Sequence, residues 1–150
     1  MSSSKELFQQ GIKNRRDVVG DVYVDRSLQN GSSEFAFAGQ QLVTEWCWGN
    51  VWSRPGLSRQ QRSLMNIGML IAIKSWPELG VHVRGALRNG LTELEVREAI
   101  LHATIYCGVP AGVEAFKVAA KTIDEMVANG EHKRQLNSVS PDFEPYVKQG

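Results

Sequence analysis

The sequence has few of the residues that mark metal, redox and nucleic-acid-binding proteins. Its two cysteines, Cys47 and Cys107, form no CxxC pair, and its three histidines form no HExxH motif. No local spacing therefore predicts a metal site or a redox-active disulfide. The formal net charge is only +1, which gives no electrostatic footprint for a nucleic acid. No apolar run approaches the roughly 20 residues that a membrane span needs.

The length of the chain and the composition of its two ends indicate its domain organisation and its compartment. With 150 residues, of which 42% are hydrophobic, we expect a single domain over residues 1–130. Residues 131–150 are polar and contain Pro141 and Pro145, which predicts a mobile or extended arm or a disordered tail. The first six residues contain no apolar signal core, so we expect a cytoplasmic protein. In a reducing compartment both thiols are expected to be free and to act as small buried hydrophobes.

Helix signals recur along the chain, whereas the short stretch 21–24 is the only candidate for a strand. Capping residues, helix-ending glycines and prolines, and apolar spacing predict about six helices in an all-α fold. The expected helices cover approximately residues 3–20, 34–48, 58–75, 77–89, 92–108 and 110–130. Residues 21–33 are expected to be irregular.

Two of these helices carry apolar patterns that predict burial. The helix over 34–48 has an apolar stripe that we expect to face inward, formed by Phe35, Ala38, Leu42 and Trp46. The helix over 58–75 is apolar nearly all round, which predicts burial on most of its sides.

Glu78 and His82 are four residues apart on the helix expected over 77–89, so they share a face. A carboxylate beside an imidazole holds it in one tautomer and brings its pKa toward the working range of acid–base catalysis. Pairs at this spacing also occur on ordinary helix surfaces, and the sequence alone leaves both interpretations open.

Arginines and tryptophans gather in the segment before this helix. Guanidinium groups bind carboxylates in a bidentate fork, so Arg54 and Arg62 suit an anionic substrate. The alternative for each is a solvated basic face. Trp48 and Trp52 lie in a segment of unusual tryptophan density, which is more typical of core or interface packing than of a ligand wall.

Two stretches of the sequence resemble the carboxymuconolactone decarboxylase family. They are EWCWGNVWSRPGL at 45–57, followed by Arg62-Ser63-Leu64, and ELGVHVRGALRNGLT at 78–92. The match continues through Glu95, Glu98, His102, Tyr106, Gly108, Pro110 and Ala111, and more loosely over residues 11–28. Together the resemblance covers approximately residues 7–128, and its WGxVWxRPGL run is its most specific part. The arm after Gly130 departs from the family pattern.

The resemblance implies a single-domain, all-α fold of the alkylhydroperoxidase-like type, assembled as trimers or hexamers. Peroxidases of this superfamily carry a CxxC followed four residues later by a histidine. Aligning that histidine with His82 puts Ser75 and Glu78 at the cysteine positions. Because neither residue can form a disulfide, thiol-dependent peroxidase activity is disfavoured.

The resemblance also implies a carboxy-lyase that converts 4-carboxymuconolactone to β-ketoadipate enol-lactone in protocatechuate breakdown. Loss of CO2 from this small anionic lactone pushes an electron pair through the ring double bond to the lactone carbonyl. The substrate is therefore its own electron sink, and we expect no cofactor and no metal. The protein must bind carboxylates, stabilise charge at the lactone oxygen and supply a proton.

Site roles follow from this chemistry as hypotheses. His82 is the candidate proton donor or polarising group, with Glu78 as its partner or the alternative acid. Arg54 and Arg62 are the candidates for binding carboxylate and developing charge. The remaining candidates are Trp48 and Trp52 as an apolar wall, Glu45 as an orienting group for an arginine, and His102 and Tyr106 in a second tier. Two other functions stay open, a related lyase or isomerase acting on another small carboxylated lactone or β-keto acid and a non-enzymatic ligand-binding oligomer.

Overall fold

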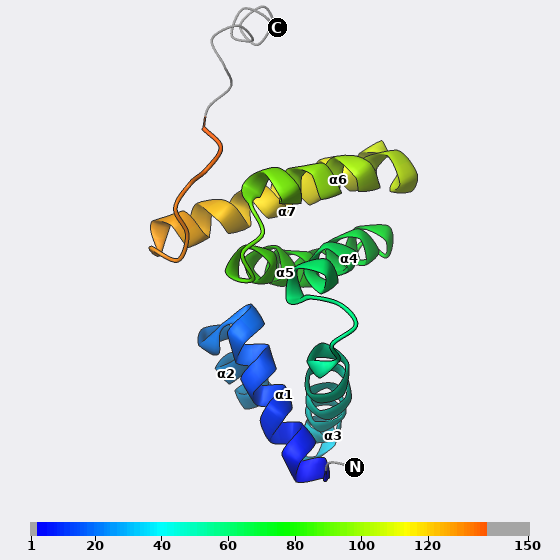
Figure 1. Ribbon diagram of the computed structural model, residues 1–150, viewed down its shortest axis with the longest axis vertical. Coiled ribbons are helices and arrows are strands. Elements are labelled where there is room, and N and C mark those ends of the chain that lie inside the picture. Colours follow the sequence, from blue (N-terminus) through cyan, green and yellow to red (C-terminus); the bar gives the residue numbers. More distant parts are fainter. Residues whose placement is uncertain (1–2, 138–150) are drawn as a thin grey trace, which may run out of the picture.

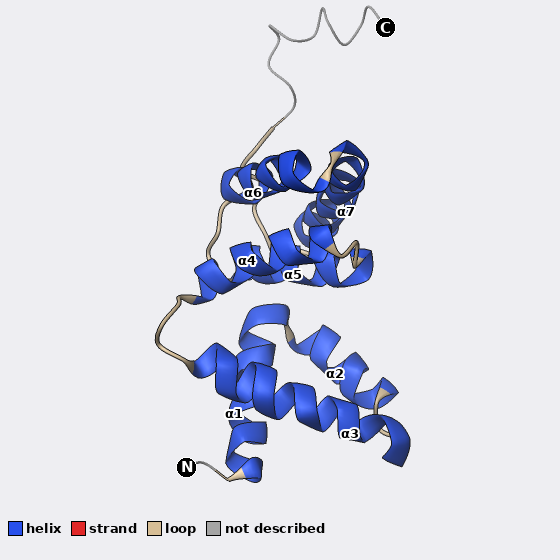
Figure 2. Ribbon diagram, turned by 90° about the vertical axis from the view of Figure 1, so that its right-hand side faces the viewer, coloured by secondary structure: helices blue, strands red, loops and turns tan. Residues whose placement is uncertain are grey.

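The computed structural model describes residues 3–137, and all regular structure in that range is helical (Figures 1 and 2). The α-helices are α1 (Ser4–Val19), α2 (Asp21–Asn30), α3 (Glu34–Leu42), α4 (Arg59–Ala72), α5 (Trp76–Arg88), α6 (Glu93–Cys107) and α7 (Val109–Ala128). A π-helix, η1 (Val43–Asn50), continues α3 and leads into a short 3-10 helix, η2 (Val51–Ser53). The predicted all-α fold is confirmed.

The helices form two lobes joined by the loop between η2 and α4 (Figure 2). The N-terminal lobe, residues 3–53, contains α1–α3, η1 and η2, and the C-terminal lobe, residues 59–137, contains α4–α7. Each lobe has its own apolar cluster, one around Val18, Val24 and Trp48 and the other around Ile67, Leu79 and Ile100. The lobes meet where α1 lies against α5 (Figure 1).

Close backbone packing of α1 against η1 shapes the N-terminal lobe. A Cβ atom added to Gly11 would overlap the carbonyl group of Thr44, and one added to Gly49 would overlap the carbonyl oxygen of Leu7. The Asn14 side chain crosses the same contact and donates to the carbonyl oxygen of Trp48 at 2.7 Å. Because glycine has no Cβ, the two helices approach closely enough for this bond to fix the backbone at Trp48.

Local helix signals in the sequence agree with the observed ends. Ser3 with Glu6, and Ser58 with Gln61, form reciprocal capping boxes at the starts of α1 and α4. Pro77 occupies the first turn of α5, where its missing N–H costs no hydrogen bond. These predicted boundaries are confirmed.

The prediction that residues 21–33 are irregular is wrong, because residues 21–30 form α2 and the strand candidate at 21–24 is helical. Gly20, with φ of 88°, ends α1 and allows a new helix to begin at once. Val24 is fully buried in the N-terminal lobe, and Tyr23 and Leu28 pack beside it. The period of these apolar positions is helical, but the segment is short and mostly polar.

The burial predicted for two helices is also wrong in the described chain. Phe35 is 95% exposed, and Leu42 and Trp46 are exposed as well, because α3 and η1 turn Thr44, Glu45, Trp48 and Gly49 inward instead. In α4 only one face is buried, through Ser63, Ile67 and Ile71, while Met65 and Met69 remain half exposed.

Residues 131–137 fold back along α6 and α7. Glu93 is buried, and its carboxylate accepts hydrogen bonds from the His132 ring at 2.9 Å and the Leu136 amide at 2.6 Å. Arg134 pairs with Asp124 at 2.6 Å. The remainder of the predicted arm, with Pro141 and Pro145, lies outside the described residues.

Two further expectations concern the cysteines and the absence of a membrane-spanning segment. Cys47 and Cys107 are both free, but Cys47 is exposed rather than buried as predicted. Partial desolvation nevertheless raises the pKa of the Cys47 thiol, although nearby Trp52 and Arg15 oppose the shift. None of the helices within residues 3–137 is long and apolar enough to cross a membrane.

Candidate active site

His82 lies on α5 where the two lobes meet. Its neighbours Leu79 and Val83 are fully buried in the C-terminal core, and the imidazole itself is half-buried. Burial lowers the pKa of His82 from 6.5 to about 4, so the ring is neutral at physiological pH. A neutral imidazole has one donor nitrogen and one acceptor nitrogen, and its environment decides which is which.

The polar contact of the His82 ring comes from Asn66 on α4. The Asn66 side-chain nitrogen lies 3.3 Å from Nδ1 of His82. An amide nitrogen donates only, so Nδ1 accepts and the ring proton sits on Nε2. Asn66 is the only hydrogen-bond partner of His82 within residues 3–137, which leaves Nε2–H to bind another group.

One of two stacked tryptophans from the N-terminal lobe lies parallel to the imidazole. The Trp48 ring is parallel to the His82 ring, with 6.1 Å between centroids and 1° between planes. Trp52 stacks on Trp48 at 4.8 Å, and both indoles are buried. Trp48 lies in the π-helix η1, a geometry that is frequent at functional sites. Of the two tryptophans predicted to form an apolar wall, Trp48 is the one whose ring lies parallel to the imidazole.

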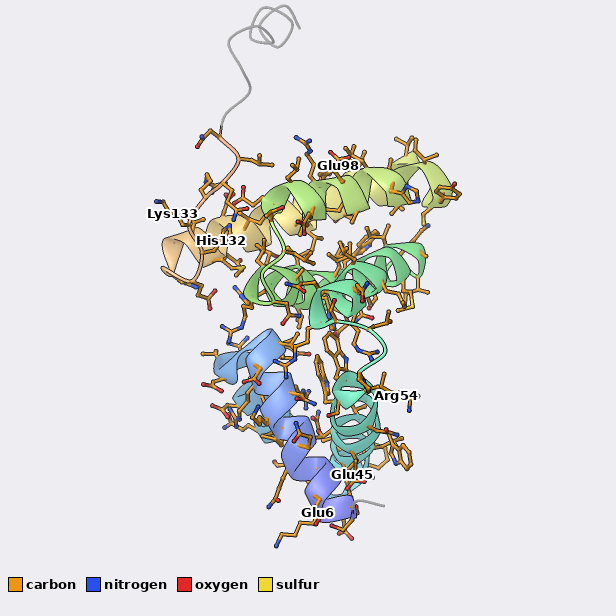
Figure 3. The ribbon with its side chains drawn as sticks, in the orientation of Figure 1. Glu6, Glu45, Arg54, Glu98, His132 and Lys133 are labelled. Atoms are coloured by element: carbon orange, nitrogen blue, oxygen red, sulfur yellow. The ribbon has the colours of Figure 1, made fainter. Side chains whose placement is uncertain are left out.

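Arg62 is one helical turn before Asn66 on α4. Its Nη2 donates to the carbonyl oxygen of Arg54 at 3.0 Å, so the two predicted arginines are joined through the backbone of Arg54. Arg62 Nε is buried and has no hydrogen-bond partner in the described part of the chain. An unpaired buried donor is costly, and it suits a site that an anionic ligand completes. The Arg54 side chain is exposed at the start of the interlobe loop (Figure 3).

Glu78 does not contact His82 through a hydrogen bond, although the two share α5. Its carboxylate is exposed and accepts from the Tyr23 hydroxyl of α2 at 3.5 Å. The i, i+4 spacing places both residues on one side of the helix but does not fix the direction of either side chain.

Glu45 is buried and orients no arginine. Its carboxylate accepts from the Ser4 hydroxyl at 2.6 Å and from the Gln41 amide at 2.9 Å. The Ser4 bond and then the Gln41 bond lower the pKa of Glu45. Figure 3 shows Glu45 near the start of α1, well away from the loop that carries Arg54. Its observed contacts therefore fasten the N-terminus of α1 to η1.

His102 and Tyr106 pair with each other on the outer face of α6. Their ring centroids are 4.9 Å apart, and both side chains are exposed. They border an apolar pocket of about 660 Å³, with walls from Leu64 and Ala99. His82 does not line this pocket, so the structure does not bring these two residues to the imidazole.

Asn66 was not predicted as a site residue, although one feature of the sequence pointed to it. It is a polar residue flanked by Met65 and Ile67 in a strongly apolar helix. Asparagine is a poor helix former, so its occurrence there indicates a specific hydrogen bond.

Within residues 3–137, no group of three or more histidine, cysteine, aspartate or glutamate side chains is placed to hold a metal ion.

Comparison with known proteins places this site in a family. Residues 38–121, which include Trp48, Arg62 and His82, match the carboxymuconolactone decarboxylase family. The chain belongs to this family. The predicted family is therefore confirmed, together with its alkylhydroperoxidase-like helical fold.

Two relatives show the type of reaction. A nitrosuccinic acid decarboxylase of Metarhizium robertsii is 55% identical over 133 residues, covering 89% of this chain and 92% of that protein. A 4-carboxymuconolactone decarboxylase of Acinetobacter baylyi is 37% identical over 124 residues, covering 83% and 92%. This member of the carboxymuconolactone decarboxylase family is a carboxy-lyase, as predicted.

Proposed function

We propose that the protein decarboxylates a small nitro dicarboxylate, with nitrosuccinate as the leading substrate. The observation that carries the proposal is the neutral His82 ring, whose Nε2–H has no hydrogen-bond partner within residues 3–137. The ring lies close in the fold to Arg62, whose buried Nε is also unpaired in that range. The higher identity to the nitrosuccinic acid decarboxylase supports the choice of this substrate over the lactone expected from the family resemblance.

The reaction needs an acceptor for one electron pair. In nitrosuccinate, one carboxylate is attached to the carbon that bears the nitro group. When that C–C bond breaks, CO2 leaves and the electron pair is delocalised over the carbon and the nitro oxygens as a nitronate. Addition of one proton to the carbon then gives 3-nitropropanoate. The substrate supplies the electron sink, so the protein has to stabilise charge at the nitro group and deliver a proton.

We assign to His82 the role of stabilising the negative charge that develops on the nitro group. Its Nε2–H donates a hydrogen bond to a nitro oxygen, and this bond strengthens as the nitronate forms. A neutral ring suits the role better than an imidazolium. An imidazolium would also attract the departing carboxylate and stabilise the ground state, which adds nothing to turnover. Burial keeps the ring neutral, because it lowers the pKa of His82 to about 4.

Arg62 and Arg54 are assigned to substrate carboxylates. Arg62 has a buried Nε without a partner in the described range, and a carboxylate would satisfy it. The exposed Arg54 meets the anion as it arrives from solvent. Trp48 and Trp52 form the apolar wall beside His82, where a departing carboxylate loses its hydration.

Two sources are candidates for the final proton, Glu78 with its Tyr23 contact and solvent, because a neutral His82 ring would have to become an imidazolate to give up its proton. The variant E78Q separates them. A kcat reduced at least tenfold, with a normal burst of CO2 in a single turnover, would assign protonation to Glu78. An unchanged kcat would assign it to solvent.

A second candidate substrate is 4-carboxymuconolactone, supported by the relative that is 37% identical. Its lactone carbonyl, reached through the ring double bond, replaces the nitro group as the electron acceptor. The same residues serve both substrates, because each presents a carboxylate on a carbon conjugated to an oxygen acceptor. A related lyase or isomerase and a non-catalytic binding protein are the weaker alternatives.

The test is an assay of purified protein with each acid in turn. CO2 and the organic product are followed together by mass spectrometry and NMR, and the rate in protein-free buffer is subtracted. Saturable conversion of nitrosuccinate to 3-nitropropanoate, at a kcat/KM at least tenfold above that for the lactone, is expected. Preferential turnover of the lactone would reverse the order of the substrates. No turnover of either acid by the folded protein would overturn both assignments.

We also propose that the chain assembles with copies of itself, as trimers or hexamers, and acts in the cytoplasm. Large apolar side chains are exposed on both lobes, including Phe35 and Trp46 on one and Ile105 and Tyr106 on the other. Exposed apolar groups on this scale are typical of subunit interfaces. Light scattering after size-exclusion chromatography tests the assembly, and I105D is expected to give smaller species.

A further inference from the structure

We propose that Asn66 is a positioning residue, which holds Nδ1 of His82 as a hydrogen-bond acceptor and so presents the Nε2–H to the substrate. This inference rests on the proposed decarboxylation for its consequence in turnover. Its structural content, the tautomer of one ring, is measurable without any substrate.

The contact joins two helices of the C-terminal lobe. Asn66 comes from α4 and His82 from α5, with 3.3 Å between the amide nitrogen and Nδ1. Trp48 lies parallel to the same ring from the other lobe. The stack restrains the plane of the imidazole, and the hydrogen bond restrains its rotation within that plane. Together they leave one orientation and one tautomer.

The chemistry of an amide explains why asparagine is suited to this position. A carboxylate beside Nδ1 would accept a hydrogen bond from a ring N–H and favour the imidazolium, as in the triads of hydrolases. An amide N–H donates to Nδ1 and therefore favours the neutral ring. No ion pair reaches His82 within residues 3–137, and burial is the sole cause of its lowered pKa. The ring is thus kept neutral by its surroundings and kept in one tautomer by Asn66.

The location of Asn66 argues against a purely structural role. The residue is half-buried between apolar neighbours on α4, where leucine or methionine would favour the helix more. Arg62 precedes it by four residues, so the proposed carboxylate anchor and the amide lie on one face of α4. The spacing aligns the group that binds the substrate with the group that orients the imidazole.

The experiment measures the His82 tautomer by long-range ¹H–¹⁵N NMR in the resting protein at pH 7, with the signal assigned through H82Q. The wild type is expected to show the Nε2–H form. In N66D the carboxylate should accept from the ring, which moves the proton to Nδ1 and raises the pKa of His82. In N66L, which has no donor, a mixture of tautomers is expected. Q60E is the matched control, because it makes the same amide-to-carboxylate change at an exposed position of α4.

Turnover adds a second readout. N66D and N66L are expected to lower kcat at least tenfold with little change in KM, whereas Q60E leaves both unchanged. A wild-type ring that carries its proton on Nδ1, or a tautomer that is the same in wild type, N66D and N66L, would overturn the positioning role even if nitrosuccinate is decarboxylated. The expected tautomer shift without turnover of either acid would uphold the contact and reject the proposed function instead. N66L keeps the test decisive if N66D does not fold.

Discussion

The imidazole of His82 lies parallel to the indole of Trp48, with 1° between the two planes. The two rings come from different lobes, His82 from α5 and Trp48 from η1. The candidate active site therefore exists only when the lobes are packed together. The stability of the contact between the lobes and the orientation of the His82 ring are therefore linked.

Replacing His82 should abolish most of the turnover. H82Q retains a polar group of similar size but removes the aromatic ring N–H, so kcat is expected to fall at least tenfold, in line with the loss of one donor to a developing oxyanion. Circular dichroism and the elution volume should stay unchanged. Wild-type turnover by folded H82Q would contradict the assignment.

Stability should depend on pH through His82. The folded-state pKa is about 4 and the unfolded value is 6.5, so the unfolded chain binds more protons between these limits. The free energy of unfolding should therefore rise from pH 4 to pH 6.5 and be unaffected by this group above that range. At about 1.4 kcal/mol per pKa unit, the His82 contribution amounts to about 3 kcal/mol. Urea unfolding of wild type and H82Q from pH 4 to 7 measures it, and parallel curves would contradict it.

Substitution of Arg62 should weaken substrate binding more than substitution of Arg54. R62K keeps the charge but loses the planar Nε donor that is buried and unpaired within the described residues. We expect KM to rise at least tenfold in R62K and only a few-fold in R54K, because the Arg54 side chain is exposed. Equal changes in the two variants would reject the role of Arg62 Nε.

The contact between α1 and η1 should be intolerant of a methyl group. In G11A the new Cβ would overlap the Thr44 carbonyl group, and the expected loss of stability is about 2 kcal/mol. G39A is the matched control, because no atom of the described residues lies within 4 Å of a Cβ at that helical position. It should stabilise α3 by roughly 0.5–1 kcal/mol. Chemical denaturation of both variants tests the pair, and equal effects would contradict the packing.

Glu93 should hold residues 131–137 against α6. The amide of Leu136 donates to its carboxylate, as does the His132 ring. Although burial opposes ionisation, the Leu136 and His132 bonds keep the pKa of Glu93 below its usual value. In E93Q the uncharged amide is a poorer acceptor, so hydrogen exchange at the Leu136 amide should be at least tenfold faster at neutral pH. An unchanged rate would show that other contacts hold the segment.

Much of the fold was predictable because its signals are local. Capping boxes at Ser3 and Ser58 place helix starts through hydrogen bonds between residues three apart, and Pro77 marks the start of α5 because it has no N–H to donate within a helix. The helix over 21–30 was missed because its stability comes from burying Val24 against other helices, and its composition carries little of that information. The exposure of Phe35 and Trp46 was not predicted for the same reason, since an apolar stripe on a helix does not reveal which part of the protein it packs against.

The sequence by itself determined the family, the helical class and the candidacy of His82, because each depends on motifs and spacings within short segments. Only the tertiary structure decided what surrounds that histidine. Asn66 rather than Glu78 forms a hydrogen bond with its ring, and Trp48 stacks on that ring. Glu45 lies away from His82 and binds Ser4 near the start of α1. Neutrality at His82 is a consequence of burial between two lobes. Burial depends on contacts among residues far apart in the chain, and no local pattern encodes them.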